Sequence, residues 1–102
     1  IVGFGFIQKF SHIRRKGVGD LVIYLHHNFH HLGLGTLIIK KLLELARNDQ
    51  MHKIEHAIDA ENTAAIGLYK NFNFKIEGLI RESFMDKNGR YQDLVFMGLI
   101  LE

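Results

Sequence analysis

Four histidines gather in one short stretch of the chain, and they are the first side chains that suggest chemistry. They include pairs at i, i+4 spacing, which would place two imidazoles on one face of a helix and so offer ligands to a metal ion. However, the stretch lies between an expected strand and a glycine turn, no acidic residue accompanies it, and the chain has no cysteine. Solvated loop histidines therefore explain the stretch better than a native metal site. The four are His26, His27, His30 and His31.

Gly33 and Gly35 follow the histidines directly and precede an amphipathic run. A strand, a glycine turn and a helix in this order offer unobstructed backbone N–H groups and the positive end of a helix to a phosphate. The pattern is neither a P-loop, since no lysine follows, nor a full dinucleotide-binding fingerprint, since the third glycine is absent. Glycines that serve only the sharp turn remain the alternative.

Asn62 and Tyr69 are seven residues apart in a second expected helix. Two helical turns separate them, so an amide and a phenol lie on one face, about 10 Å apart along the axis. Periodicity alone favours Tyr69 as a core aromatic beside Ile66 and Phe72, and a role in chemistry is the second interpretation.

Five segments have the composition of strands. The first two flank a polar, glycine-containing segment and are expected to pair as a hairpin, and Asn88-Gly89 predicts a second hairpin between the last two. The segments are residues 1–8, 20–26, 53–59, about 75–85 and 91–101.

Apolar residues recur at helical spacing after Gly33 and predict a helix that covers a sheet. A second helix is expected from Asn62, its N-cap, to Phe72, with Asn73 as the left-handed residue that ends it. Strands that alternate with helices predict an α/β fold with a mixed, partly parallel sheet flanked by helices. The apolar positions of the first helix are Leu34, Ile38, Ile39, Leu42, Leu43, Leu45 and Ala46.

The composition is that of an ordinary globular protein. A length of 102 residues predicts one domain over 1–102, with 47% hydrophobic and 24% charged residues and a net charge of +2. No apolar run is long enough for a membrane helix, and the opening residues lack the features of a secretory signal. The absence of cysteine excludes disulfides and thiolate chemistry. Neither a membrane nor nucleic acid is expected as a partner, and the cytoplasm is expected by elimination.

Three motifs in order resemble the GNAT superfamily of acyl-CoA-dependent N-acetyltransferases. "HHLGLGT" is similar to the family's Gln/Arg-x-x-Gly-x-Gly/Ala signature, and "ENTAAIGLYKNFNF" is similar to its Asn-x-x-Ala-x-x-Leu-Tyr-x-x-x-Gly-Phe helix. "IEGLIRESFMDKNGRYQDLVFMGLIL" is similar to its closing hairpin. Each motif alone occurs in many unrelated proteins, whereas the three motifs in this order are specific to the family.

The resemblance implies a GNAT-like fold that binds acetyl-CoA as cosubstrate. Its pantetheine arm would run beside Ile23, Tyr24 and Leu25, Asn62 would bond its middle, and Tyr69 would stand by the sulfur. The pyrophosphate would sit on the main-chain amides of His31, Leu32, Gly33, Leu34, Gly35 and Thr36.

The implied reaction is transfer of the acetyl group to a primary amine of a small molecule or amino acid. The amine attacks the thioester directly, a backbone amide of the preceding strand polarises the carbonyl, and Tyr69 protonates the departing thiolate. No metal is required. The expected partners are acetyl-CoA and the amine acceptor, and a homodimer is compatible with these features.

The sequence departs from the family pattern at three positions, which are His30 in the Gln/Arg place, Asn73 in the glycine place, and Ala57. Some relatives that modify protein N-termini carry a glutamate base where Ala57 stands, twelve residues before the tyrosine. A base is still needed, because an alkyl ammonium with a pKa near ~10 is mostly protonated at neutral pH. Asp20, His26 or an ordered water are the candidates.

The family's first strand, first two helices and second strand would precede Ile1, so the domain is expected to be incomplete at its N-terminus. With Ala57, this leaves a non-catalytic acyl-CoA-binding module as the alternative function. RNA binding through a basic loop is a weaker third hypothesis, because the basic residues do not alternate with a series of aromatic side chains on which successive bases could stack. Its residues are Lys9, Arg14, Arg15 and Lys16.

Overall fold

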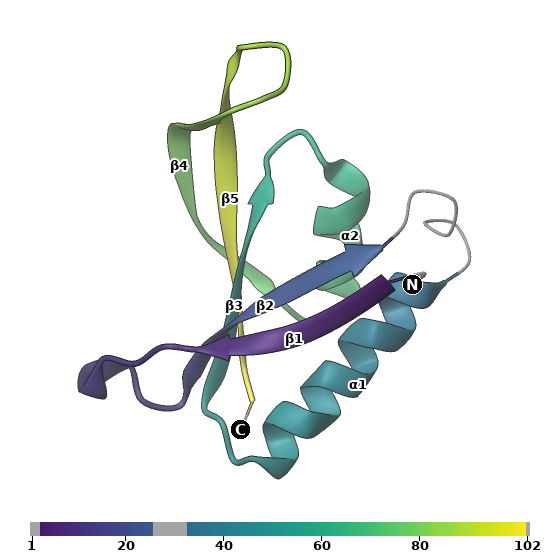
Figure 1. Cartoon of the computed structure of the whole chain (residues 1–102), viewed down its shortest axis with the longest axis vertical. Coiled ribbons are helices and arrows are strands. Elements are labelled where there is room, and N and C mark those ends of the chain that lie inside the picture. The colour runs from purple at the N-terminus through teal and green to yellow at the C-terminus, as the bar shows by residue number, and fades with distance from the viewer. Residues whose placement is uncertain (1–2, 26–32, 102) are drawn as a thin grey trace. The chain divides into compact units, whose positions relative to one another are not determined.

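The computed structural model describes residues 3–25 and 33–101, and it contains the predicted five strands and two helices (Figure 1). Contacts divide the chain into two compact units, 1–54 with 100–102 and 55–99, which are described separately below. No helix within the described ranges is long and apolar enough to cross a membrane. The elements are β1 (Gly3–Lys9), the 3₁₀ turn η1 (Ile13–Arg15), β2 (Val18–Leu25), α1 (Leu34–Asn48), β3 (Lys53–Asp59), α2 (Thr63–Asn71), β4 (Lys75–Met85) and β5 (Tyr91–Ile100).

The strands are hydrogen-bonded in the order β1-β2-β3-β5-β4, and the hairpins β1/β2 and β4/β5 are antiparallel. The amides of His52 and Lys53 donate to the Gly17 carbonyl at 2.8 and 3.1 Å, so β3 starts beside the start of β2. The Leu101 amide donates to the His52 carbonyl at 2.9 Å, so the end of β5 meets the start of β3. The predicted mixed, partly parallel sheet is confirmed.

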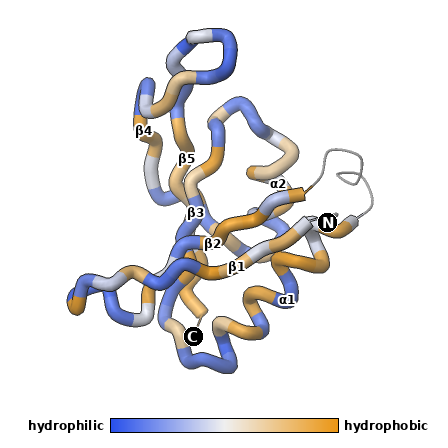
Figure 2. Tube along the Cα trace, viewed as in Figure 1, coloured by the Kyte–Doolittle hydropathy of each residue, from blue (hydrophilic) through white to orange (hydrophobic). Residues whose placement is uncertain are grey.

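In the first unit, one face of the β1/β2 hairpin is covered by α1. A Cβ placed on Gly5 of β1 would lie 2.6 Å from Ile38 and 3.0 Å from Leu42, so strand and helix pack closely at this point. Apolar and polar residues alternate along α1 at helical spacing (Figure 2). Leu45 is 50% exposed and lies at the edge of the predicted apolar stripe, where it lines a hollow together with Gly5 and Ile7 of β1. The buried side chains of α1 are Ile39, Leu42, Leu43 and Ala46.

In the second unit, α2 has the bounds that its capping residues predict. The Asn62 side chain accepts a hydrogen bond from the Ala65 amide at 3.1 Å and caps the N-terminus. Asn73 has φ 71° and ends the helix in the left-handed conformation, as predicted. The chain then turns back so that Phe74, only 2% exposed, enters the core. The buried side chains of this unit are Ile58, Tyr69, Phe74, Val95, Met97 and Leu99.

The predicted β4/β5 hairpin is present, and β4 contains a bulge that the sequence pattern did not reveal. The register shifts between Ile80 and Phe84, and Glu82 within this stretch has φ 49°. The Glu82 amide donates to the Asp93 carboxylate on β5 at 2.8 Å. The backbone carbonyl of Asp93 accepts from the Ala60 amide at 3.0 Å, so Asp93 ties the bulge to the loop that precedes α2.

The turn of this hairpin is organised by Asp86 and is hydrophilic (Figure 2). The Gly89 amide donates to the Asp86 carbonyl at 3.0 Å, and Gly89 has φ 81°. The Asp86 carboxylate accepts from the amides of Asn88 and Arg90 and from the Gln92 side chain, at 2.9, 3.0 and 2.9 Å. These bonds, the one from the Arg90 amide first, lower the pKa of Asp86 below its usual 3.8.

A carboxyl whose pKa is lower in the folded state stabilises the fold above its unfolded pKa, and this stability is lost as the pH falls through the folded pKa. We expect Asp86→Ala to lower the free energy of unfolding at pH 6, and we expect the difference from the wild type to shrink as the pH falls below the usual value of 3.8. Urea unfolding of both proteins at pH 6 and pH 3 measures this. A difference that is equal at the two pH values would contradict the assignment.

Candidate functional site

The first candidate region lies where β2 ends and α1 begins, at the same end of the first unit (Figure 1). Gly33 is the N-cap of α1 and has φ 73°, a left-handed conformation that glycine adopts without strain. Its carbonyl accepts from the Leu37 amide at 3.2 Å and so starts the helix. Among the described residues, no side chain caps this end. The N–H groups of the first helical turn therefore point out of the helix end, where the helix dipole favours an anion.

Among the described atoms, the space beside Gly33 is open. A Cβ placed on Gly33 would have nothing within 4 Å among the described atoms. Leu34, Gly35 and Thr36 form the first turn, and no acidic residue lies in it to repel an anion. The arrangement fits a phosphate group that approaches the main chain. His31 and Leu32, predicted to contribute further amides, lie outside the described residues.

The three residues predicted to flank the pantetheine arm form the last part of β2 and point to two faces. Ile23 and Leu25 pair with Gly5 and Gly3 of β1, and the Cβ position of Gly5 faces α1. Their side chains therefore lie on the helix-covered face. Tyr24 lies on the opposite face, is 51% exposed, and contacts the Phe4 ring at 5.6 Å between centroids. A single ligand can therefore contact all three residues only through their main-chain atoms.

The second candidate region is α2, which carries Asn62 and Tyr69 two turns apart, as predicted. Asn62 is exposed, and because its Oδ1 accepts the Ala65 amide, its Nδ2 group points outward as a donor. Tyr69 is only 5% exposed, which confirms the prediction that its ring belongs to the core. Burial of the ring is compatible with a role for the hydroxyl group at its far end.

Sequence analysis missed the ring that contacts Tyr69 from β3. The His56 imidazole lies 5.0 Å from the Tyr69 ring between centroids, tilted by 33°. The period of two in a strand places His56 on the same face as the buried Ile54 and Ile58. This alternation was the available signal that His56 points inward.

The remaining predictions divide between described and undescribed positions. The candidate base His26 and the other three histidines of the metal hypothesis lie outside the described residues. Within 3–25 and 33–101, no three potential ligand side chains come together as a metal site. Asp20 is part-exposed on β2 opposite Gln8, and Ala57 lies on β3 on the face opposite to His56.

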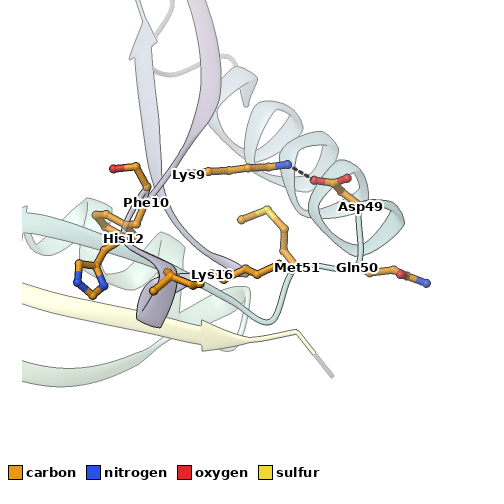
Figure 3. Close-up of a pocket in the computed structure, with 10 residues that line it drawn as sticks. Lys9, Phe10, His12, Lys16, Asp49, Gln50 and Met51 are labelled. Carbon is orange, nitrogen blue, oxygen red and sulfur yellow. Dashed lines mark hydrogen bonds and ion pairs between the residues drawn. The ribbon is translucent and has the colours of Figure 1, made fainter.

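A cavity of about 570 Å³ in the first unit lies away from the predicted site (Figure 3). It opens at the C-terminal end of α1, where Lys9 forms an ion pair with Asp49 beside Met51 (Figure 3). The 15 residues of α1 separate it from Gly33 by roughly 22 Å. Lys9 and Lys16 of the RNA-binding hypothesis line it, but none of the residues predicted to bind acetyl-CoA or to act in catalysis does. The structure therefore gives no reason to place the acetyl-transfer chemistry there.

The chain is similar to known acetyltransferases over most of its length. The model described as "Acetyltransferase (GNAT) family" matches residues 1–74. An L-methionine sulfoximine/L-methionine sulfone acetyltransferase of Pseudomonas paraeruginosa is 33% identical over 87 residues, which are 85% of this chain and 50% of that protein. An L-amino acid N-acetyltransferase of Escherichia coli is 27% identical over 98% of this chain and 62% of its own length.

The fold is also found among solved structures. A phosphinothricin acetyltransferase of the GNAT superfamily from Sinorhizobium meliloti, crystallised in complex with acetyl-CoA, superposes with a TM-score of 0.92. The match covers 98% of this chain and 54% of that one at 20% identity, so it concerns the fold. The chain spans only half to about three-fifths of the length of these proteins.

Proposed function

Because the chain belongs to the acetyltransferase (GNAT) family, we propose that it is the cofactor-binding and catalytic part of an acetyl-CoA-dependent N-acetyltransferase. The acceptor is the primary amine of an amino acid or a similar small molecule. This class of acceptor is supported by relatives named for L-methionine sulfoximine and for L-amino acids. The complete enzyme, its substrates and its assembly belong to this proposal, because the chain spans only part of each relative.

The observation that carries the proposal is the N-terminus of α1. It begins at a left-handed glycine with open space beside it and has no side-chain cap among the described residues. The amides from Gly33 to Thr36 would bind the pyrophosphate, and the amides of His31 and Leu32, outside the described residues, belong to the same proposal. The backbone of Ile23, Tyr24 and Leu25 would hold the pantetheine arm at the neighbouring end of β2.

Acetyl-CoA, when bound, supplies an acetyl group activated as a thioester. In the proposed reaction the lone pair of the acceptor nitrogen forms the C–N bond while the C–S bond breaks. The Tyr69 phenol gives its proton to the sulfur, and the proton released by the ammonium passes through a base and solvent back to the phenolate. Asp20, His26 or an ordered water is the proposed base, since Ala57 cannot take that role.

The test is release of free thiol from acetyl-CoA by the full-length protein across a panel of L-amino acids and simple amines. We expect amine-dependent release, and we expect acetyl-CoA at a hundred times its Kd to stabilise the fold by about 2.7 kcal/mol. Thermal stabilisation without thiol release for any amine would instead support the non-catalytic acyl-CoA-binding module. Absence of both would refute the proposal.

Asn62 has two roles in this proposal, and two substitutions separate them. Asn62→Ala removes the cap and should cost about 1 kcal/mol of stability. Asn62→Asp keeps the oxygen that accepts the Ala65 amide but removes the Nδ2 donor, so its stability should stay close to that of the wild type. Both should raise the KM for acetyl-CoA by about threefold to tenfold, the value of one hydrogen bond.

Thermal unfolding and steady-state kinetics check this prediction. A KM that rises in Asn62→Ala and stays unchanged in Asn62→Asp would show that Asn62 acts only as a helix cap.

A further inference from the structure

The ring of Tyr69 contacts two other rings. The His56 imidazole lies 5.0 Å from it between centroids, with an angle of 33° between the planes. The Phe74 ring lies 5.1 Å from it and meets it edge to face, at 80°. Tyr69 and Phe74 are 5% and 2% exposed, so the cluster is packed and not a surface contact. Aromatic rings at these separations restrict one another's orientation.

Both neighbours are placed by rigid backbone. His56 lies in the middle of β3, between the buried Ile54 and Ile58 on the same face. Phe74 is fixed by the end of α2, where the left-handed Asn73 turns the chain and the Phe74 amide donates to the Tyr69 carbonyl at 3.1 Å. The Tyr69 ring therefore contacts one ring that is placed by the sheet and one that is placed by the end of its own helix.

We propose that His56 is a positioning residue for Tyr69, whose ring plane it fixes from the β3 side so that the phenolic oxygen points at the leaving sulfur. The proposal rests on the proposed function. A proton donor must lie within hydrogen-bond reach of its target, and a displacement of about 1 Å can cost as much as a hundredfold in rate. A ring that contacts both His56 and Phe74 has little freedom to tilt, whereas a ring that contacts only Phe74 can tilt toward the space left by His56.

Two substitutions separate the ring of His56 from its nitrogen atoms. His56→Phe keeps a flat ring against Tyr69 and removes the nitrogens, and His56→Asn keeps a polar nitrogen near the same position and removes the ring. We expect kcat in His56→Asn to fall by about tenfold, with the KM for acetyl-CoA within about threefold of the wild type, because positioning acts on the transition state. His56→Phe should recover kcat to within about threefold of the wild type.

A readout independent of activity accompanies the kinetics. The chain has three tyrosines, so 3-fluorotyrosine labelling gives three fluorine resonances, and Tyr69→Phe identifies the one from Tyr69. We expect this resonance to move or broaden in His56→Asn and to stay near its wild-type position in His56→Phe. Val95→Ala, a truncation of a buried residue on β5 in the same unit, controls for general loosening of the core.

Four results would overturn the proposal. They are full activity in both His56 variants, activity in His56→Asn with loss in His56→Phe, loss in both variants with an unchanged Tyr69 resonance, and an equal fall of kcat in Val95→Ala at matched stability. If Tyr69→Phe leaves kcat unchanged, the acid role of the tyrosine fails. The fluorine spectra then still decide whether His56 orients the ring.

Discussion

Replacing Tyr69 with phenylalanine is expected to lower kcat by about a hundredfold, at the lower end of what a lost general acid costs. The ring and its contacts with His56 and Phe74 remain, so the fold and the proposed cofactor site should persist. In the proposed reaction the thiolate must then leave without a proton from the enzyme. The KM for acetyl-CoA should change by less than about threefold, because the hydroxyl is proposed to act in the transition state and not in ground-state binding.

The matched control is Tyr91→Phe, which removes the same hydroxyl group from a tyrosine that is 60% exposed at the start of β5. Its kcat and KM should equal those of the wild type. Thiol-release kinetics at saturating amine, with acetyl-CoA varied, measure both variants. If Tyr69→Phe lowers kcat and raises KM by the same factor, or leaves both unchanged, Tyr69 is a core residue without an acid role.

Leu43→Ala is expected to give the largest loss of stability, about 3 kcal/mol of an expected total of 5–15 kcal/mol. Leu43 is 2% exposed in α1, the helix that packs on the hairpin of β1 and β2. Truncation leaves a cavity in this contact, and the contact also holds the helix whose N-terminus is proposed to bind the pyrophosphate. Saturating acetyl-CoA should recover part of the loss, because it binds only the folded state.

Leu37→Ala makes the same change in the same helix at a side chain that is 61% exposed. We expect it to alter the free energy of unfolding by less than about 0.5 kcal/mol. Urea denaturation of both variants, with and without acetyl-CoA, is the measurement. Similar losses in the two variants would mean that α1 is not anchored on the face that contains Leu43.

The secondary structure could be predicted closely, because its signals are local. The bounds of β3 match the expected segment 53–59, and β2 begins two residues earlier than expected. Asn62 caps α2 and Asn73 ends it, both through the conformations that asparagine favours. A cap or a left-handed residue acts on the few residues next to it, so its effect is visible in the sequence.

The contacts between elements could not be predicted in the same way. Seven apolar positions of α1 satisfied helical spacing, and periodicity alone did not show that only four of them are buried while Leu45 is 50% exposed. The left-handed Glu82 in β4 also has no local sequence signal, because it depends on a hydrogen bond to Asp93, eleven residues away. Such features are decided by which elements meet.

The sequence by itself determined the order of strands and helices, the Gly33 turn, the cap at Asn62 and the family of the chain, because each depends on residue types at short spacing. Only the tertiary structure decided that His56 and Phe74 contact the ring of the buried Tyr69. His56 and Tyr69 are thirteen residues apart on different elements, and their contact exists only because α2 packs on β3. The sequence therefore identifies which side chains are proposed to act in the reaction, whereas the packing of the helices and strands determines how those side chains are oriented.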